Sequence, residues 1–84
     1  MIPIHELMNR IRWDEEFGDA EIVIGYYDRQ QDEILRRPLK ECFFEEGDHY
    51  FFHFLDEDGE QHSVPLHRIK EVNRDGECIW RREH

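Results

Sequence analysis

The stretch of sequence that decides the fold is HYFFHFLDEDGEQHSVP, residues 49–65. Its first half carries aromatic side chains at Tyr50, Phe52 and Phe54, which is the two-residue period of a strand with one buried face. An acidic run that ends in glycine follows and interrupts this alternation, as a hairpin turn does. We therefore predict a strand over residues 49–56 and a hairpin beyond it.

The register of this hairpin depends on the length of its loop. A three-residue loop with Gly59 in the left-handed conformation sets Phe54 and Phe52 opposite His62 and Val64. A two-residue loop would instead set both aromatic residues opposite polar partners. Since a slip of one residue turns an entire strand face over, we expect the register that gathers the apolar partners.

Beyond the hairpin, Pro65 cannot donate to a sheet ladder, so the sequence predicts that the strand ends there. Residues 65–68 are expected to form a tight turn. Residues 69–73 and 77–82 are expected to form a last hairpin across Arg74-Asp75-Gly76.

Ahead of the aromatic strand, the chain starts with the pattern of an amphipathic helix. The apolar residues fall at i, i+3, i+4 and i+7, which places them on one helical stripe. This pattern predicts a helix over about residues 3–12, with a stripe formed by Ile4, Leu7, Met8 and Ile11.

Two strands are expected between this helix and the aromatic hairpin. Residues 20–28 alternate as a half-buried strand does, and residues 33–39 return after a polar turn. Because Pro38 cannot donate to a ladder, the second strand is expected to lie at a sheet edge or to stop there. Residues 40–48 are predicted to be a loop or a short helical turn. One N-terminal helix and five or six short strands indicate an α+β fold, in which the helix packs on a mainly antiparallel, strongly bent sheet or small barrel.

Length and composition limit the class of protein. The 84 residues suit a single domain with one core, and the 11 aromatic residues (Phe 6, Tyr 3, Trp 2) argue against disorder. Trp13 and Trp80 are expected to anchor that core. No signal peptide or membrane-spanning run is visible, and Cys42 and Cys78 do not form a secreted disulfide framework. We therefore expect a soluble, cytoplasmic domain with two reduced, packed thiols.

The formal net charge of −10 limits how this chain could bind nucleic acid. Proteins that follow a nucleic-acid backbone are normally basic, because neutralising phosphates drives that binding. Residues 41–60 hold eight acidic residues and no Lys or Arg, whereas residues 67–82 hold five basic and three acidic residues. Nine of the 11 basic residues are Arg, which favours bidentate contacts with few phosphates. An Arg-rich composition without functional cause explains the same count equally well.

Six histidines raise the question of a metal or catalytic site. His49 and His53 have H-x3-H spacing, but on a strand this separates their backbones by about 13 Å, too far for the usual shared ion. No cysteine pair completes a zinc site, and the chain contains no phosphoesterase, P-loop or serine-hydrolase motif. No metal, cofactor or catalytic residue is therefore expected.

Two short clusters combine aromatic and cationic residues: Gly25-Tyr26-Tyr27-Asp28-Arg29 and Pro65-Leu66-His67-Arg68-Ile69. Aromatic faces that stack a base, together with Arg side chains that hold phosphate, are the ingredients of single-strand RNA recognition. The simpler explanation of the first cluster is a core tyrosine and a turn ion pair.

These clusters belong to a longer series with Ile11-Arg12-Trp13-Asp14, Arg37-Pro38 and Asp75-Gly76-Glu77-Cys78-Ile79-Trp80. The series resembles, in order and over almost the whole chain, a small archaeal family of uncharacterised proteins named for RNA cyclic group end recognition. The resemblance implies a non-catalytic RNA-binding module that recognises RNA 3′ ends, with or without a 2′,3′-cyclic phosphate. Similar domains in larger eukaryotic proteins sit beside RNA-processing domains, which makes RNA-processing enzymes the implied partners.

Resemblance and residue pattern together define an expected site. A cyclic phosphate is a monoanion that needs only a few charge-assisted donors, and a nearby aromatic ring can stack the terminal base. The expected residues are Arg12, Arg29, Arg68 and His67 as donors on one surface patch, Tyr26 as the stacking ring, and Asp28 as the group that orients Arg29. Either Tyr26 or Tyr27 is expected to be partly exposed beside this patch. The alternative is a protein–protein interaction adaptor in RNA processing that uses the acidic face of residues 41–60. An end-processing enzyme is a third, minor option.

Overall fold

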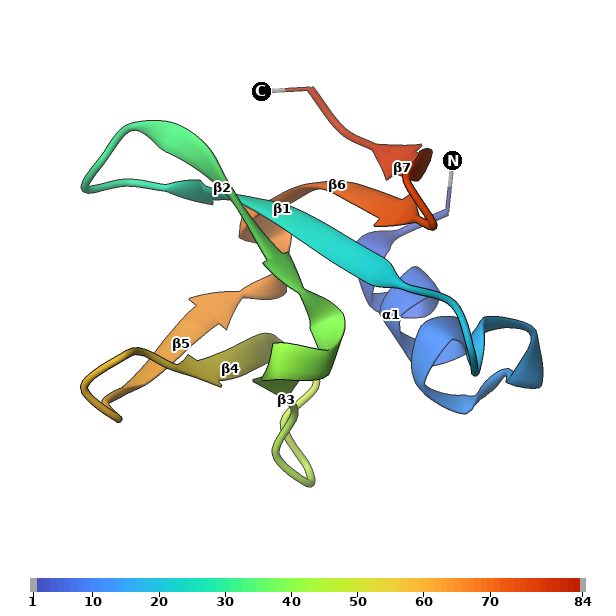
Figure 1. The fold of residues 1–84 in the computed structure, drawn as a ribbon, viewed down its shortest axis with the longest axis horizontal. Helices are drawn as coiled ribbons and strands as arrows, with labels where there is room; N and C mark the ends of the chain where they lie inside the picture. The colour runs from blue at the N-terminus through green and yellow to red at the C-terminus, as the bar shows by residue number, and fades with distance from the viewer. Residues whose placement is uncertain (1, 84) are drawn as a thin grey trace.

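The computed structural model describes residues 2–83 and shows an α+β fold, as expected (Figure 1). The elements in chain order are α1 (Ile4–Trp13), η1 (Glu15–Phe17), β1 (Ile22–Asp28), β2 (Glu33–Pro38), η2 (Leu39–Glu41), β3 (Cys42–Phe43), β4 (Phe51–Leu55), β5 (Gln61–Pro65), η3 (Leu66–Arg68), β6 (Ile69–Arg74) and β7 (Glu77–Arg81), where η denotes a 3₁₀ helix. Within the described part of the chain, no helix is both long and apolar enough to span a bilayer.

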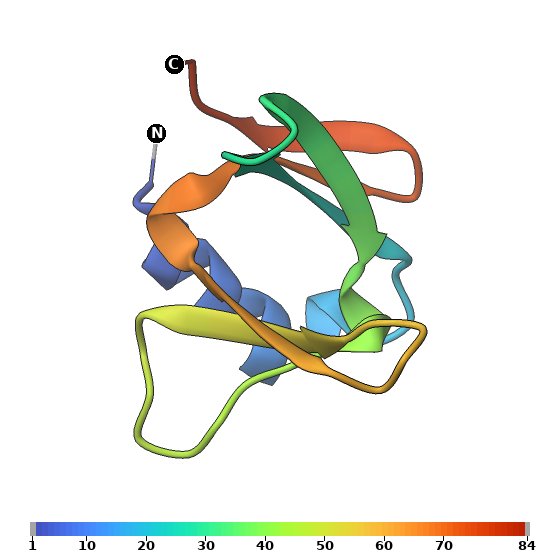
Figure 2. The same cartoon turned by 90° about the vertical axis from the view of Figure 1, so that its left-hand side faces the viewer.

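The predicted antiparallel pairing is confirmed, but the single bent sheet or small barrel is not fully matched, because among residues 2–83 seven strands, where five or six were expected, form two sheets. One sheet has the order β2-β1-β6-β7 and the other has the order β3-β4-β5. Figures 1 and 2 show the two sheets as separate layers, with α1 at one end of the space between them. Strand β2 is an edge strand, as its proline predicted.

The chain crosses between the sheets at two similar turns. Pro38 precedes η2 and Pro65 precedes η3, with φ angles of −62° and −61°. Each proline withholds a ladder hydrogen bond, and the 3₁₀ turn that follows redirects the chain into the other sheet. The predicted turn over residues 65–68 is therefore confirmed, and its role is to change sheets.

The core lies between the sheets and α1. The predicted helix stripe is confirmed, because all four of its residues are at most 8 % exposed. From β1 the inward face supplies Ile22, Ile24 and Tyr26, and from the opposite sheet β4 supplies Phe52 and Phe54.

The hairpin register is the expected one. Phe52 pairs with Val64 and Phe54 pairs with His62, and Gly59 has a φ angle of +81°. The Asp56 carboxylate accepts the backbone N–H groups of Asp58 and Glu60 and contacts His62. The pKa of Asp56 is lowered from its usual 3.8, mostly by the hydrogen bond with His62 and to a smaller extent by the hydrogen bond from the Glu60 backbone.

Two predictions about packing need correction. Trp80 is buried, and its Nε1–H donates to the carbonyl oxygen of Ile2 at 2.8 Å, but Trp13 is 74 % exposed. Trp13 follows Ile11 by two positions, which places it off the buried stripe of the helix. Both thiols are free, but only Cys42 is partly buried, whereas Cys78 is exposed.

Candidate functional site

A groove runs beside α1, bounded by the helix, the segment that leads into β4, and η3. It consists of two adjoining hollows of about 450 and 610 Å³ that share His5, His49 and Leu66. We call it the helix groove. Figure 2 shows η3 beside α1, and the two elements are in contact.

The helix contributes a polar stripe to this groove. His5, Asn9 and Arg12 line the first hollow, and they fall at i, i+4 and i+7, next to the apolar stripe that faces the core. The same helical period that predicted the core could therefore have indicated a functional face. His5 and Asn9 were missed because only the apolar residues were considered.

Arg12 lies at one end of the groove and is held by aromatic rings. Its guanidinium carbon is 4.6 Å from the ring centre of Phe44 and 5.5 Å from that of Trp13. Among residues 2–83 no carboxylate forms an ion pair with Arg12. The exposed Trp13 thus helps to orient a cation whose charge is not neutralised by a direct partner.

The other end of the groove is built on η3. His67 is exposed there, and Arg82 lines the same hollow. A terminal nitrogen of Arg82 donates to the carbonyl oxygens of His67 and Ile69, at 2.7 and 2.8 Å. Arg82 therefore fixes the backbone that carries His67.

Tyr50 and Phe51 form an aromatic wall in the second hollow. They are 77 % and 37 % exposed, respectively. The backbone N–H of Tyr50 donates to the Asp48 carboxylate at 3.0 Å, in a turn that precedes β4. Strand β4 consequently begins two residues later than predicted, and the Tyr50 ring is left accessible for stacking.

The prediction that Tyr26 is the stacking residue was wrong. It is only 4 % exposed and packs edge-on against Phe52, with ring centres 5.5 Å apart. It lies on the inward face of β1 with Ile22 and Ile24, so the simpler interpretation as a core residue was correct. The neighbouring Tyr27 is partly exposed, and its hydroxyl donates to Asp32, which raises the pKa of Tyr27.

The residues of the expected patch are divided between two places. Arg12 and His67 line the helix groove, whereas Arg29 lies in the β1–β2 turn, at the opposite end of the molecule from the last turn of α1 (Figure 1). The Asp28 carboxylate accepts the backbone N–H of Gln30 at 3.0 Å and so closes this turn, a role different from the expected orientation of Arg29. Arg68, next to His67, is partly exposed.

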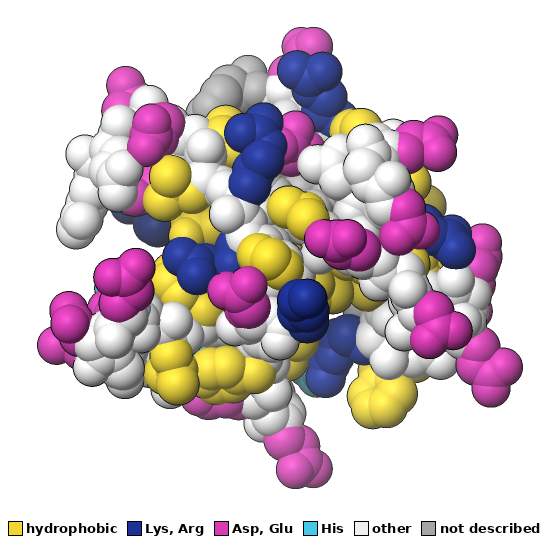
Figure 3. Space-filling view, viewed as in Figure 1, with side chains coloured by type: hydrophobic (Ala, Val, Ile, Leu, Met, Phe, Trp, Pro, Cys, Tyr) yellow, Lys and Arg dark blue, Asp and Glu magenta, His cyan; other side chains and the backbone are white. Residues whose placement is uncertain are grey.

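The charges of the groove differ from those of the whole chain. Its walls combine Arg12 and Arg82 with Glu6 and Asp48, so the groove is formally balanced although the chain carries −10. On the face seen in Figure 3, acidic side chains are spread among and around the basic ones, without a continuous basic track. This arrangement suits a compact anion better than a long phosphate backbone.

Comparison with known proteins gives one match. The family model described as the MJ1316 RNA cyclic group end recognition domain matches residues 1–82. Neither the curated proteins nor the solved structures that were searched contain a match. The matched range includes every element of the helix groove, through Arg82.

Proposed function

We propose, from the premise that this chain belongs to the RNA cyclic group end recognition family, that it binds RNA 3′ ends in the helix groove and prefers a 2′,3′-cyclic phosphate. The observation that carries the proposal is that Arg12, His67 and the exposed ring of Tyr50 all line one groove. These residues are distant in sequence. A chain with a charge of −10 needs such a local site to hold a polyanion by its end.

Each of these residues has a role that fits its surroundings. Arg12 presents a planar guanidinium to the anion, and ring contacts with Phe44 and Trp13 limit its motion. His67 supplies a second donor on a turn that Arg82 fixes. Tyr50 offers a face on which the terminal base can stack. Arg68 remains a further candidate donor because it follows His67 directly.

We propose binding without catalysis. General acid–base hydrolysis of a cyclic phosphate needs imidazoles or carboxylates that are held in place on both sides of the reacting phosphorus. His5, His49 and His67 are all exposed, and among residues 2–83 none of them hydrogen-bonds to a carboxylate that would orient it.

The test compares short RNAs that differ only in their 3′ terminus: cyclic phosphate, 3′-phosphate and hydroxyl. Fluorescence anisotropy should show the tightest binding for the cyclic phosphate. Two or three phosphate contacts, at about −0.7 each for a single strand, predict a log–log salt slope of roughly −1.5 to −2. Affinity that grows with RNA length and ignores the terminus would refute end recognition.

Two further outcomes identify the alternatives. A stoichiometric protein partner that copurifies without RNA would support the adaptor, with residues 41–60 as its acidic face. Conversion of the cyclic phosphate to a monophosphate by the pure protein would show an enzyme.

A further inference from the structure

Beside the helix groove, one buried side chain has a polar atom without a hydrogen-bond partner. His53 on β4 is 4 % exposed. Its Nδ1 lies 2.8 Å from Ser63 Oγ on β5. Its Nε2 is buried without a hydrogen-bond partner within residues 2–83 and lies 3.5 Å from Asp48 Oδ2. Leaving such a buried group unsatisfied is unfavourable, and a bound ion is one of the arrangements that removes this cost.

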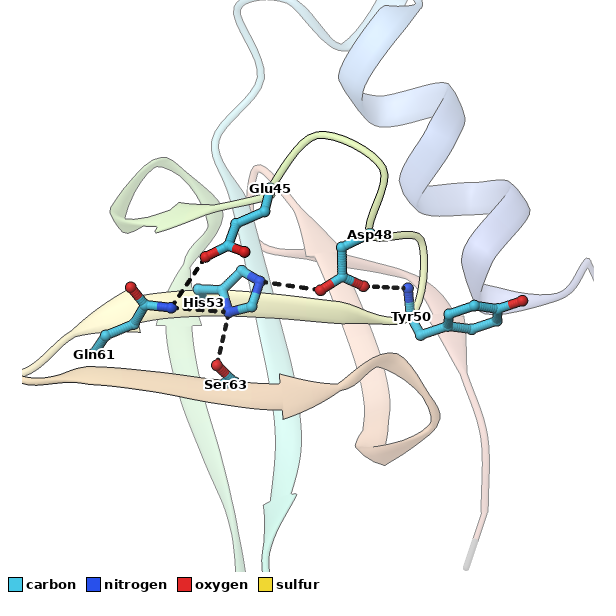
Figure 4. A network of polar contacts seen from close by, with 6 residues as sticks. All are labelled: Glu45, Asp48, Tyr50, His53, Gln61 and Ser63. Carbon is cyan, nitrogen blue, oxygen red and sulfur yellow. Dashed lines mark hydrogen bonds and ion pairs between the residues drawn. The ribbon is translucent and has the colours of Figure 1, made fainter.

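Two carboxylates lie close to this nitrogen. Figure 4 shows Glu45 and Asp48, from the segment before β4, on the same side of the strand as the His53 ring. One ligand atom from each of the three residues lies within 4.8 Å of the other two. The cluster therefore offers one imidazole nitrogen and two carboxylate oxygens to a common point.

Each potential ligand has a hydrogen-bond partner in the chain, and Gln61 contacts two of them, Glu45 and His53 (Figure 4). Ser63 contacts Nδ1 of His53. The backbone N–H of Tyr50 donates to Oδ1 of Asp48, which leaves Oδ2 directed at the imidazole. The amide nitrogen of Gln61 donates to Glu45 at 3.2 Å. Residues that bind a metal are commonly oriented by outer hydrogen bonds of this kind.

We propose that Glu45, Asp48 and His53 bind a divalent transition-metal ion, with Zn²⁺ as the appropriate probe. An imidazole ligand favours such an ion over Mg²⁺ or Ca²⁺, which prefer all-oxygen sites. With metal–ligand bonds of about 2.0–2.2 Å, two ligands of one tetrahedral ion lie about 3.4 Å apart. The 3.5 Å between His53 Nε2 and Asp48 Oδ2 matches this separation. Rotation of the exposed Glu45 side chain can complete the triad.

This site differs from the His49–His53 pair that the H-x3-H spacing brought up as a metal site. His49 and His53 were considered as a pair and rejected, and the structure gives no reason to restore that pair, because His49 is exposed and lines the helix groove. The partners of His53 are instead the carboxylates of Asp48 and Glu45, which precede it by five and eight positions in the sequence. Asp48 also lines the helix groove, but the proposed metal site does not depend on what that groove binds.

The experiment uses the full chain, stripped with EDTA and titrated with Zn²⁺ alone by calorimetry. The expected result is one Zn²⁺ per chain and a melting temperature that is higher in Zn²⁺ than in EDTA. Glu45→Gln should weaken Zn²⁺ binding at least about tenfold. Changing a residue that only hydrogen-bonds to a metal ligand already weakens binding by about tenfold or more, and loss of a ligand should cost at least as much. Because Glu45 is exposed, the melting temperature of this variant in EDTA should equal that of the wild type.

His49→Gln is the matched control. It removes an exposed imidazole close to the cluster and should leave both stoichiometry and affinity unchanged. The proposal is overturned if the wild-type chain binds no stoichiometric Zn²⁺, or if Glu45→Gln binds it as tightly as the wild type. It is also overturned if His49→Gln abolishes binding.

Discussion

Replacing Gly25 with alanine should destabilise the fold, because the Glu71 side chain occupies the space that the new methyl group needs. Gly25 lies in β1, opposite Arg36 of β2 and Glu71 of β6. Arg36 Nε and Glu71 Oε1 form an ion pair at 2.5 Å, which thus joins two strands that are not neighbours. A Cβ at position 25 would lie 2.5 Å from Cγ of Glu71 and 2.7 Å from its Oε1.

The size of the effect follows from these contacts. Cγ is close to the backbone, so Glu71 can avoid the new methyl group only by changing its rotamer and leaving Arg36. Overpacking typically costs about 1–3 kcal/mol, and loss of this partly exposed ion pair adds up to about 1 kcal/mol. Alanine is more favourable than glycine inside a strand by about 0.5–1 kcal/mol, which offsets part of this cost. The net loss therefore lies between about 0 and 3.5 kcal/mol. A central value of about 2 kcal/mol corresponds to roughly 8–16 °C in melting temperature for a domain of this size.

A double-mutant cycle tests the cause of this loss. Thermal and urea unfolding would be measured for the wild type, Gly25→Ala, Glu71→Ala and the double variant. If the Glu71 side chain is the obstacle, Gly25→Ala should cost little or be stabilising in the Glu71→Ala background. An equal cost in both backgrounds would refute the reasoning. The glycine of the Gly25–Arg29 motif would then need another explanation, such as a ligand contact.

Three further predictions concern single side chains. Arg12→Ala should weaken binding of a cyclic-phosphate RNA by about 1.5–3 kcal/mol, or roughly 10- to 150-fold, whereas Arg29→Ala should change the affinity little. If an anisotropy titration shows the larger loss for Arg29→Ala, the site lies in the β1–β2 turn. The lowered pKa of Asp56 contributes stability that is present above the usual value of 3.8 and is lost as pH falls through the lowered folded pKa. Asp56→Asn should therefore flatten the acid limb of a stability profile measured by urea unfolding, and an unchanged limb would contradict the assignment. Burial raises the pKa of Cys42 to about 11, so iodoacetamide at pH 8 should alkylate the exposed Cys78 first and reach Cys42 only on unfolding; mass spectrometry that finds equal rates would contradict this order.

Most of the element order and one strand register could be predicted from the sequence because both depend on neighbouring residues, but the short strand β3 lies inside the expected loop and was missed. The helix stripe repeats every turn, so its period alone identifies the buried face of α1. The pairing of Phe52 with Val64 follows from a three-residue loop and the left-handed conformation of Gly59. These signals act over a few residues and do not require knowledge of the rest of the fold.

The division into two sheets and the composition of the helix groove were decided only by the tertiary structure. A proline marks the end of a strand, but it does not specify whether the next strand joins the same sheet or another. Tyr26 and Tyr50 both fall on alternating strand patterns, and only the packing of the second sheet makes Tyr26 a core residue and leaves Tyr50 on the surface. Arg12 and His67 line the two ends of one groove because η3 packs beside α1. No local periodicity encodes that contact, since it arises from burying the apolar faces of three separate layers against one another.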